Sequence, residues 1–97
     1  MDSFKNILWY LVAGTRGGQT RAKIIESVKK RPANANKLSN KLSLDYKTIQ
    51  HHLDILVKNN IFTVVKEGSY GAVYFLSEEM NKNIAVFEDI WERFGNK

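Results

Sequence analysis

Hydrophobic residues recur every three to four positions through the first 60 residues, which predicts a series of helices. In the first of them, Phe4, Ile7, Leu8 and Leu11 share one face, and other apolar residues extend it almost all the way round. The segment "GTRGG", residues 14–18, ends this helix because adjacent glycines favour left-handed and turn conformations. We therefore expect an apolar helix over residues 1–13 and then a tight turn.

A second helix is predicted from Gln19 or Thr20 to the basic triplet "KKR", residues 29–31, because Pro32 disfavours helix in the residue before it. Cations at a helix C-terminus are stabilised by the helix dipole, so the triplet has a structural explanation besides contact with a polyanion. The segment "NANKLSNKL", residues 34–42, predicts a short third helix, with Asn36 as its N-cap.

A tight turn at Ser43 leads to a fourth helix, which we expect Asp45 to cap and residues 59–60 to end. Its apolar stripe consists of Ile49, Leu53, Leu56 and Val57. After residue 60 the period changes, because "IFTVVKE" (61–67) and "AVYFL" (72–76) are typical of strands, with a hairpin loop "GSYG" between them.

The chain ends with a further predicted helix, from about residue 77 to 94. Its apolar residues are spaced 4, 3, 4 and 3 apart: Met80, Ile84, Phe87, Trp91 and Phe94. The order of elements indicates a mainly α fold with a β-hairpin wing, which is a winged helix-turn-helix with extra N- and C-terminal helices. We expect one domain over residues 1–97, with the helices at 1–13 and 78–97 used for dimerisation.

The first half of the fourth helix presents an outward polar face. With 100° per residue from Ile49, Gln50 lies at about 100°, Lys47 at about 160° and His51 at about 200°. In a helix-turn-helix protein, the N-terminal residues of the second helix reach base edges, where Gln pairs with adenine and Lys with guanine. Any solvated helix face is polar, but this one carries no acidic residue between positions 46 and 53, where an ordinary face mixes signs.

Charge is distributed unevenly along the chain, whose net charge is +5. Residues 1–60 carry 11 Lys/Arg against 4 Asp/Glu, and residues 61–97 carry 4 against 6. A polyanion partner is therefore expected for the first part only, with scattered solubilising charge as the alternative. Lys37 and Lys41 are candidates for phosphate contacts, as are Thr48 and the wing residues Lys66, Ser69 and Tyr70, whereas Arg16 and Arg21 are weaker candidates.

Several kinds of chemistry find no support in the sequence. Without cysteine there is no disulfide, thiolate metal site or cysteine nucleophile, and adjacent His51 and His52 point about 100° apart, so they cannot chelate one ion. We expect His52 to be half-buried and bonded to nearby backbone. No catalytic pair or phosphate loop is evident, so neither an enzyme nor a cofactor is predicted. The longest apolar run, residues 7–13, is too short to span a membrane, and a cytoplasmic, nucleoid-associated protein is expected.

The terminal helices suggest a homodimer. The tail helix is acidic and should lie away from DNA, and a chain of 97 residues has little interior in which to hide both terminal helices. A C2 dimer would place two reading helices about 34 Å apart, facing an inverted repeat. The alternative is that the seam covers the chain's own core. The expected interface residues are Phe4, Ile7, Leu8, Leu11, Ile84, Phe87, Trp91 and Phe94.

The sequence resembles the ArsR-type winged-helix regulators, especially the small archaeal members. The resemblance rests on "TRAKII" (20–25), "NKLSNKLSLDYKTIQHHLDIL" (36–56) and "VYFL" (73–76), and it covers roughly residues 15–77. It implies a homodimeric regulator of transcription that contacts double-stranded DNA through the wing and through Tyr46, Lys47, Thr48, Gln50 and His51. The family's metal-ligand clusters and the arginine at its wing tip are not found here, so neither metal sensing nor minor-groove reading is implied.

A second function remains open, namely a winged-helix protein–protein interaction module in a transcription or assembly complex. Such a module would not require a reading face free of acidic residues. Salt dependence separates the two hypotheses, because binding to DNA phosphates weakens steeply as salt rises.

Overall fold

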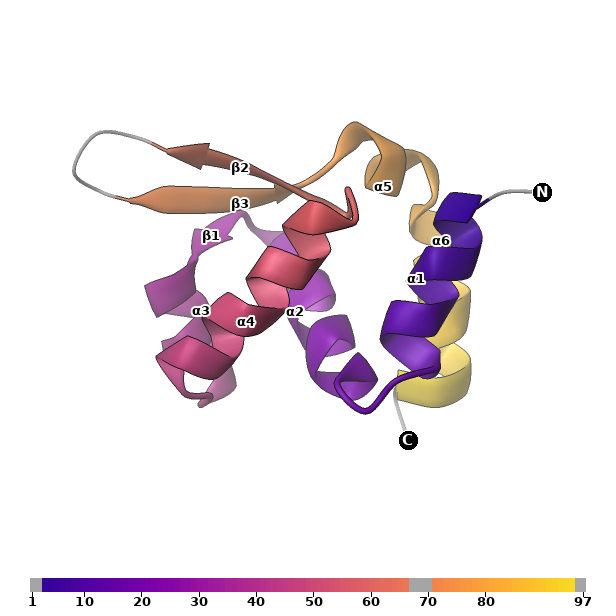
Figure 1. Cartoon of the computed structure of the whole chain (residues 1–97), viewed down its shortest axis with the longest axis horizontal. Coiled ribbons are helices and arrows are strands. Elements are labelled where there is room, and N and C mark those ends of the chain that lie inside the picture. The colour runs from indigo at the N-terminus through magenta and orange to yellow at the C-terminus, as the bar shows by residue number, and fades with distance from the viewer. Residues whose placement is uncertain (1–2, 67–70, 96–97) are drawn as a thin grey trace.

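Helices from the two ends of the chain pack side by side at one end of the molecule, and a β-hairpin projects at the other (Figure 1). The computed structural model describes residues 3–66 and 71–95. Its elements are α1 (Ser3–Ala13), α2 (Gly18–Lys30), β1 (Ala33–Asn34), α3 (Ala35–Leu42), α4 (Tyr46–Lys58), β2 (Phe62–Lys66), β3 (Ala72–Leu76), α5 (Glu78–Lys82), α6 (Ile84–Ile90) and a π-helical turn η2 (Trp91–Gly95). This mainly helical architecture with a hairpin wing confirms the predicted fold class.

The sheet has three antiparallel strands in the order β1-β3-β2. The hairpin pairs Val64 with Tyr74 and Phe62 with Leu76, while β1 pairs Ala33 with Tyr74 on the other edge. Strand β1 was not predicted, because two residues are too few to show a period. Pro32 lacks a backbone N–H and disfavours helix before it, so the chain runs extended here and joins the sheet.

One hydrophobic core lies between the helices and the inner face of the hairpin. Ile49, Leu53 and Leu56 of α4 are fully buried in it, as predicted, and Val57 at the edge of the stripe is half-buried. Burying a Leu or Ile side chain stabilises a fold by about 1.5–3 kcal/mol. These residues therefore fix which side of α4 faces inward.

Helix α3 begins two residues earlier than its predicted N-cap implied. Asn34, and not Asn36, is the N-cap of α3, since its side chain accepts a hydrogen bond from the Lys37 N–H at 2.8 Å. Asn34 ends β1 in an extended conformation (φ −89°, ψ 170°), which is the backbone geometry that an N-cap needs. At the other end of α3, Ser43 adopts a left-handed conformation with φ 54° and forms the predicted tight turn.

The tail is not the single helix that the 4-3-4-3 spacing predicted. Ser77 caps α5 by accepting a hydrogen bond from the Met80 N–H, but α5 ends at Asn83, whose side chain donates to the Glu79 carbonyl. The break changes the register, so that Ile90 becomes fully buried while Phe94 remains 53% exposed.

The segment of residues 14–18 ends α1 in a turn, as predicted, but its glycines serve close packing and do not adopt left-handed conformations. Gly17 has φ −84°, and Gly71 is the one glycine with positive φ among the described residues. A Cβ on Gly18 would lie 2.2 Å from the Val12 carbonyl oxygen, which no real side chain tolerates. Glycine is therefore required because α2 starts directly against the end of α1.

A buried arginine ties this turn to α4. Arg21 is 5% exposed, and its guanidinium donates to the Leu11 carbonyl at 2.8 Å, to the Thr15 hydroxyl and to His52 Nδ1 at 3.2 Å. An arginine only donates, so Nδ1 must accept and the neutral ring carries its proton on Nε2. The prediction that His52 bonds to backbone was therefore wrong, and Arg21 is not available to DNA phosphates.

Acidification should destabilise the fold through His52. Burial, the charge of Arg21 and His51 together hold the pKa of His52 below its ordinary value. Because of this, His52 takes up a proton at a higher pH in the unfolded chain than in the folded one. The stability that depends on neutral His52 is therefore fully present above about pH 6.5 and is lost as pH falls from there toward the folded-state pKa. We expect the free energy of unfolding, measured by urea titration, to decrease between pH 7 and pH 5. His52→Gln should flatten this slope, whereas His51→Gln, at the exposed neighbour, should retain it.

Ser43→Gly should stabilise the protein by about 0.5–1 kcal/mol, since serine is strained in a left-handed conformation and glycine is not. Asn60 has a similar φ of 59°, but asparagine tolerates this region better, so Asn60→Gly should give a smaller gain. Denaturant midpoints of the two variants test this comparison. An equal or larger effect at residue 60 would contradict the strain assigned to Ser43.

Candidate nucleic-acid interface

The start of α4 is set by its cap. The Asp45 carboxylate accepts hydrogen bonds from the backbone N–H groups of Lys47 at 3.0 Å and Thr48 at 3.3 Å, as the sequence predicted. This cap begins the helix at Tyr46, so its first turn follows directly from the turn after α3. The N-terminal end of a helix carries partial positive charge, which favours contact with phosphate.

The first two turns of α4 present an open polar surface. Lys47, Thr48 and His51 are exposed, and Tyr46 is 51% exposed, while Ile49 on the opposite face is fully buried. The rotation predicted from the sequence is therefore the one observed. No described part of the chain covers Lys47 or His51.

Gln50 lies at the margin of this surface and is held by other side chains. It is half-buried, and its amide nitrogen donates to Asp54 Oδ1 at 3.0 Å and to the Tyr74 hydroxyl at 3.2 Å. Tyr74 comes from β3, so this contact joins the reading helix to the base of the wing. The sequence placed Gln50 on the outer face but gave no sign of its bond to a residue 24 positions away.

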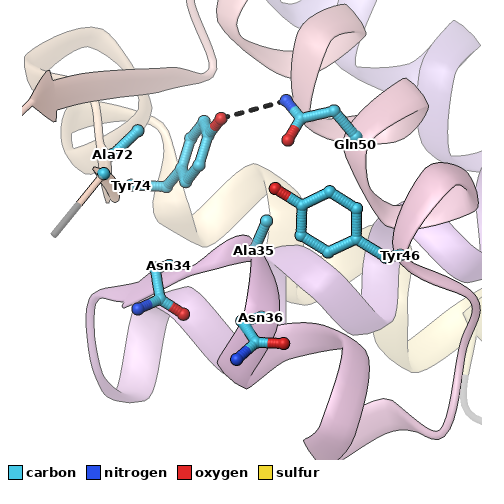
Figure 2. Close-up of a pocket in the computed structure, with 8 residues that line it drawn as sticks. Asn34, Ala35, Asn36, Tyr46, Gln50, Ala72 and Tyr74 are labelled. Carbon is cyan, nitrogen blue, oxygen red and sulfur yellow. Dashed lines mark hydrogen bonds between the residues drawn. The ribbon is translucent and has the colours of Figure 1, made fainter. Parts of the chain in front are cut away.

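A polar cavity of about 220 Å³ opens between α3, α4 and β3. Figure 2 shows the Tyr46 ring and the Gln50 side chain entering it from α4, and Tyr74 entering it from β3. The other lining residues are Asn34, Ala35, Asn36, Gly71 and Ala72. Polar groups from four elements, β1, α3, α4 and β3, thus meet beside the start of α4.

Free cations flank this region. Four exposed lysines on α3, α4 and the hairpin form no ion pair within residues 3–66 and 71–95: Lys37, Lys41, Lys47 and Lys66. The predicted wing contacts Ser69 and Tyr70 lie outside the described residues. The weaker candidate Arg16 is exposed in the α1–α2 turn.

Part of the positive charge elsewhere is matched by acidic residues. Lys29 bonds to Glu88 of α6 at 2.9 Å, and this hydrogen bond raises the pKa of Lys29. Lys30 lies 3.9 Å from Glu26, and Arg93 pairs with Asp89 in the tail. Lys29 and Lys30 at the basic end of α2 therefore have a structural role, whereas the exposed Lys23 and Arg31 form no ion pair within residues 3–66 and 71–95.

Half of the predicted dimer interface is buried within the chain itself, which is a correction. Phe4, Leu8, Leu11 and Phe87 are at most 8% exposed, because α1 and α6 pack their main apolar faces on the shared core. The remaining four residues keep some accessible surface: Ile7 and Phe94 are exposed, while Ile84 and Trp91 are half-buried.

Two exposed aromatic residues were missing from the predicted interface. Trp9 is 38% exposed and Tyr10 63% exposed on α1, and the Trp9 ring meets the Phe94 ring edge-on at 5.3 Å. The sequence signal was present, since α1 is apolar nearly all round. A helix with one face in its own core and aromatic residues left on another has surface for a partner.

No described segment offers a metal site or a membrane span. Within residues 3–66 and 71–95, no three histidine or carboxylate groups come together in a way that would hold an ion. No helix in these ranges is long and apolar enough to cross a bilayer.

Comparisons with known proteins agree with this geometry. Residues 18–62 match the family model described as "Bacterial regulatory protein, arsR family", whereas a search of the curated proteins found no match. The matched segment runs from α2 to the start of β2, so it contains the whole helix-turn-helix.

Solved structures extend the similarity to nearly the whole chain. Reduced HlyU from Vibrio cholerae has a TM-score of 0.68 and 20% identity, covering 92% of this chain and 90% of that one. An ArsR-like transcriptional regulator from a Rhodococcus species has a TM-score of 0.66 and 22% identity, covering 92% and 84%. A MarR transcriptional regulator from Methanosarcina mazei has a TM-score of 0.74 and 16% identity, covering 96% of this chain and 67% of that one.

At these identities the solved structures establish the fold, and the family model establishes the type of helix-turn-helix. The chain accordingly has a winged helix-turn-helix fold whose residues 18–62 resemble the arsR family of regulatory proteins, and this resemblance and the fold support DNA-binding transcription regulation.

Proposed function

We propose that two copies of this chain form a dimer that reads an inverted repeat in double-stranded DNA through residues 45–58. The observation that carries the proposal is the exposed start of α4, whose outward side chains are uncharged or cationic. It is set between lysines of α3 and the wing that form no ion pair with any part of the chain that the structure describes. Phosphates attract such a surface strongly, and the major groove accepts one helix.

Within this arrangement each group has a distinct role. Lys47 and His51 face the base edges, where Lys47 suits guanine O6 and N7. Lys37, Lys41 and Lys66 bind phosphates and set the orientation, since backbone contacts position a protein without reading sequence. Gln50 also faces a base edge, and Tyr46, Thr48, Ser69 and Tyr70 complete the proposed contact set.

The dimer supplies the second reading helix. We assign its contact to the accessible part of α1 and the tail, where Tyr10 and Phe94 are the most exposed aromatic residues. This surface lies at the opposite end of the molecule from the wing (Figure 1), so pairing there leaves α4 free. The proposed partners are therefore duplex DNA and a second copy, on the nucleoid.

Charge removal should separate base readers from phosphate binders. A bound sequence is first selected from a random DNA pool, and affinity is measured by fluorescence anisotropy at several salt concentrations. Lys41→Ala should reduce the slope of log affinity against log salt by about 0.9. Lys47→Ala should cost about 1–3 kcal/mol on the selected site and much less on random DNA. Lys82→Ala removes a lysine that pairs with Glu78 in the tail and should change neither quantity.

If no sequence is enriched and binding to DNA is insensitive to salt, the protein is an interaction module and the proposal fails. If DNA is bound but Lys47→Ala has no effect on the selected site, the reading helix has been misassigned.

Tyr10→Lys should convert the dimer to monomer, because a charge buried in an apolar contact is costly. Sedimentation equilibrium of the purified protein measures the change, and the melting profile shows whether the fold persists. Phe75→Lys changes a 38% exposed aromatic residue of the wing and should leave the dimer intact. A wild-type protein that stays monomeric at tens of micromolar, with and without DNA, would rule out the proposed dimer.

A further inference from the structure

The side chain of Gln50 is fixed at its nitrogen end by two acceptors. Asp54 lies one turn further along α4 and accepts at 3.0 Å, and the Tyr74 hydroxyl accepts at 3.2 Å. An amide nitrogen carries two hydrogens, so both of its donors are used within the protein. Figure 2 shows the nitrogen directed at Tyr74 and the amide oxygen on the side of the Tyr46 ring.

The chemistry of the partners determines which way the amide points. An ionised carboxylate only accepts hydrogen bonds, so the atom of Gln50 that lies against Asp54 must be the nitrogen. The reverse orientation would set two acceptors against each other. The amide oxygen is consequently the one group of this side chain left to meet an outside molecule.

Tyr74 is itself firmly held. It is 5% exposed, its backbone lies in the central strand β3 between Ala33 and Val64, and its ring packs near Phe62 at 6.5 Å. Its hydroxyl thus reaches Gln50 from a fixed position. Gln50 and Tyr74 line both the polar cavity beside Tyr46 and a second cavity, of about 340 Å³, that Asp54 also lines.

We propose that Tyr74 is a positioning residue that makes Gln50 a pure acceptor, so that this site reads an amino group in the major groove. The inference rests on the proposed function, because it specifies which base edge the reading helix recognises. Amino groups in the major groove are adenine N6 and cytosine N4, whereas guanine and thymine present acceptors to the same position.

A glutamine in this state does not make the usual bidentate contact with adenine. That contact needs one amide hydrogen for N7 and the oxygen for the N6 amino group, and here both hydrogens are already donated. Asp54 adds a further acceptor on the nitrogen side of the amide, and a carboxylate favours the cytosine amino group. The structure therefore predicts that adenine and cytosine are accepted about equally at one position.

The decisive experiment is a base scan of the selected site with three proteins. The position that Gln50 reads is the one whose base preference disappears in Gln50→Ala. There, the wild type should bind adenine and cytosine with affinities within about threefold, and both about tenfold or more above guanine and thymine. Tyr74→Phe frees one amide hydrogen and lets the amide turn, so adenine should then exceed cytosine by about tenfold or more.

Loss of a purely structural hydroxyl would lower affinity for all four bases alike and would leave their ratio unchanged. A wild-type protein that already prefers adenine over cytosine tenfold, or a Tyr74→Phe protein with an unaltered ratio, overturns the inference while leaving the proposed function standing. A protein without any sequence preference overturns both.

A measurement without DNA tests the bond itself. In nitrogen-15-resolved NMR, the signals of the two side-chain amide hydrogens of Gln50 can be assigned because they disappear in Gln50→Ala. Both hydrogens should exchange slowly with water in the wild type. In Tyr74→Phe one of them should exchange about tenfold faster, while Asp54 still protects the other. Equal and fast exchange of both hydrogens in the wild type would show that the amide is not held, and the inference would fail.

Discussion

The burial of one apolar stripe determines how α4 is turned about its own axis. Ile49, Leu53 and Leu56 are completely inaccessible, and a rotation of even one residue would expose them and bury charge. Asp45 fixes the helix start along the axis, because its carboxylate satisfies two of the free N–H groups of the first turn. The rotation of α4 about its axis and the position of its first residue together make Lys47 and His51 face outward. Every functional assignment made for this chain depends on that geometry.

Arg21 extends the constraint from α4 to α1. Its guanidinium joins the Leu11 carbonyl at the end of α1 to the His52 ring on the inner side of α4. A buried cation is costly unless its donors are satisfied, and here each guanidinium nitrogen has a partner. Gly17 leaves the room for it, since a Cβ there would lie 2.6 Å from the guanidinium. Arg21 thus joins α1, the proposed dimer helix, to α4, the proposed reading helix. A shift of either helix would therefore displace the other.

Sequence reasoning succeeded where structure is determined by neighbours along the chain. The period of α4, its cap at Asp45 and the change to strand after residue 60 all follow from residues within one or two turns. It was wrong where two local solutions compete, as for Asn34 and Asn36, either of which can cap a helix. Asn34 is the cap because β1 holds it extended, and that pairing with β3 is not visible locally. The break at Asn83 is of the same kind, since the 4-3-4-3 seam was equally compatible with one helix.

In the candidate site, too, features set by neighbouring residues were predictable, whereas features set by contacts across the fold were not. The exposed face of α4 was predictable, because a buried stripe implies an opposite face. The state of Gln50 was not, because Tyr74 reaches it across the fold from β3. The dimer interface was the least predictable part of the site. The sequence shows that Leu8 and Leu11 are apolar, but not whether they pack against the chain's own core or against a second copy. Their complete or nearly complete burial assigns them to the core.

The energetics of recognition explain why the proposed reading helix would need a second copy. Three base-reading side chains, each discriminating by about 1–3 kcal/mol, give roughly 3–9 kcal/mol of specificity. A genome offers about 10⁶ or more competing sites, and outcompeting them requires about 8 kcal/mol or more. One α4 thus reaches the requirement only if every contact is near its upper limit, and a Gln50 that accepts two bases falls short of that limit. Two copies double the discrimination without a new contact, provided that both helices meet the duplex on one face. The exposed aromatic residues of α1 and the tail, remote from α4, leave that geometry available.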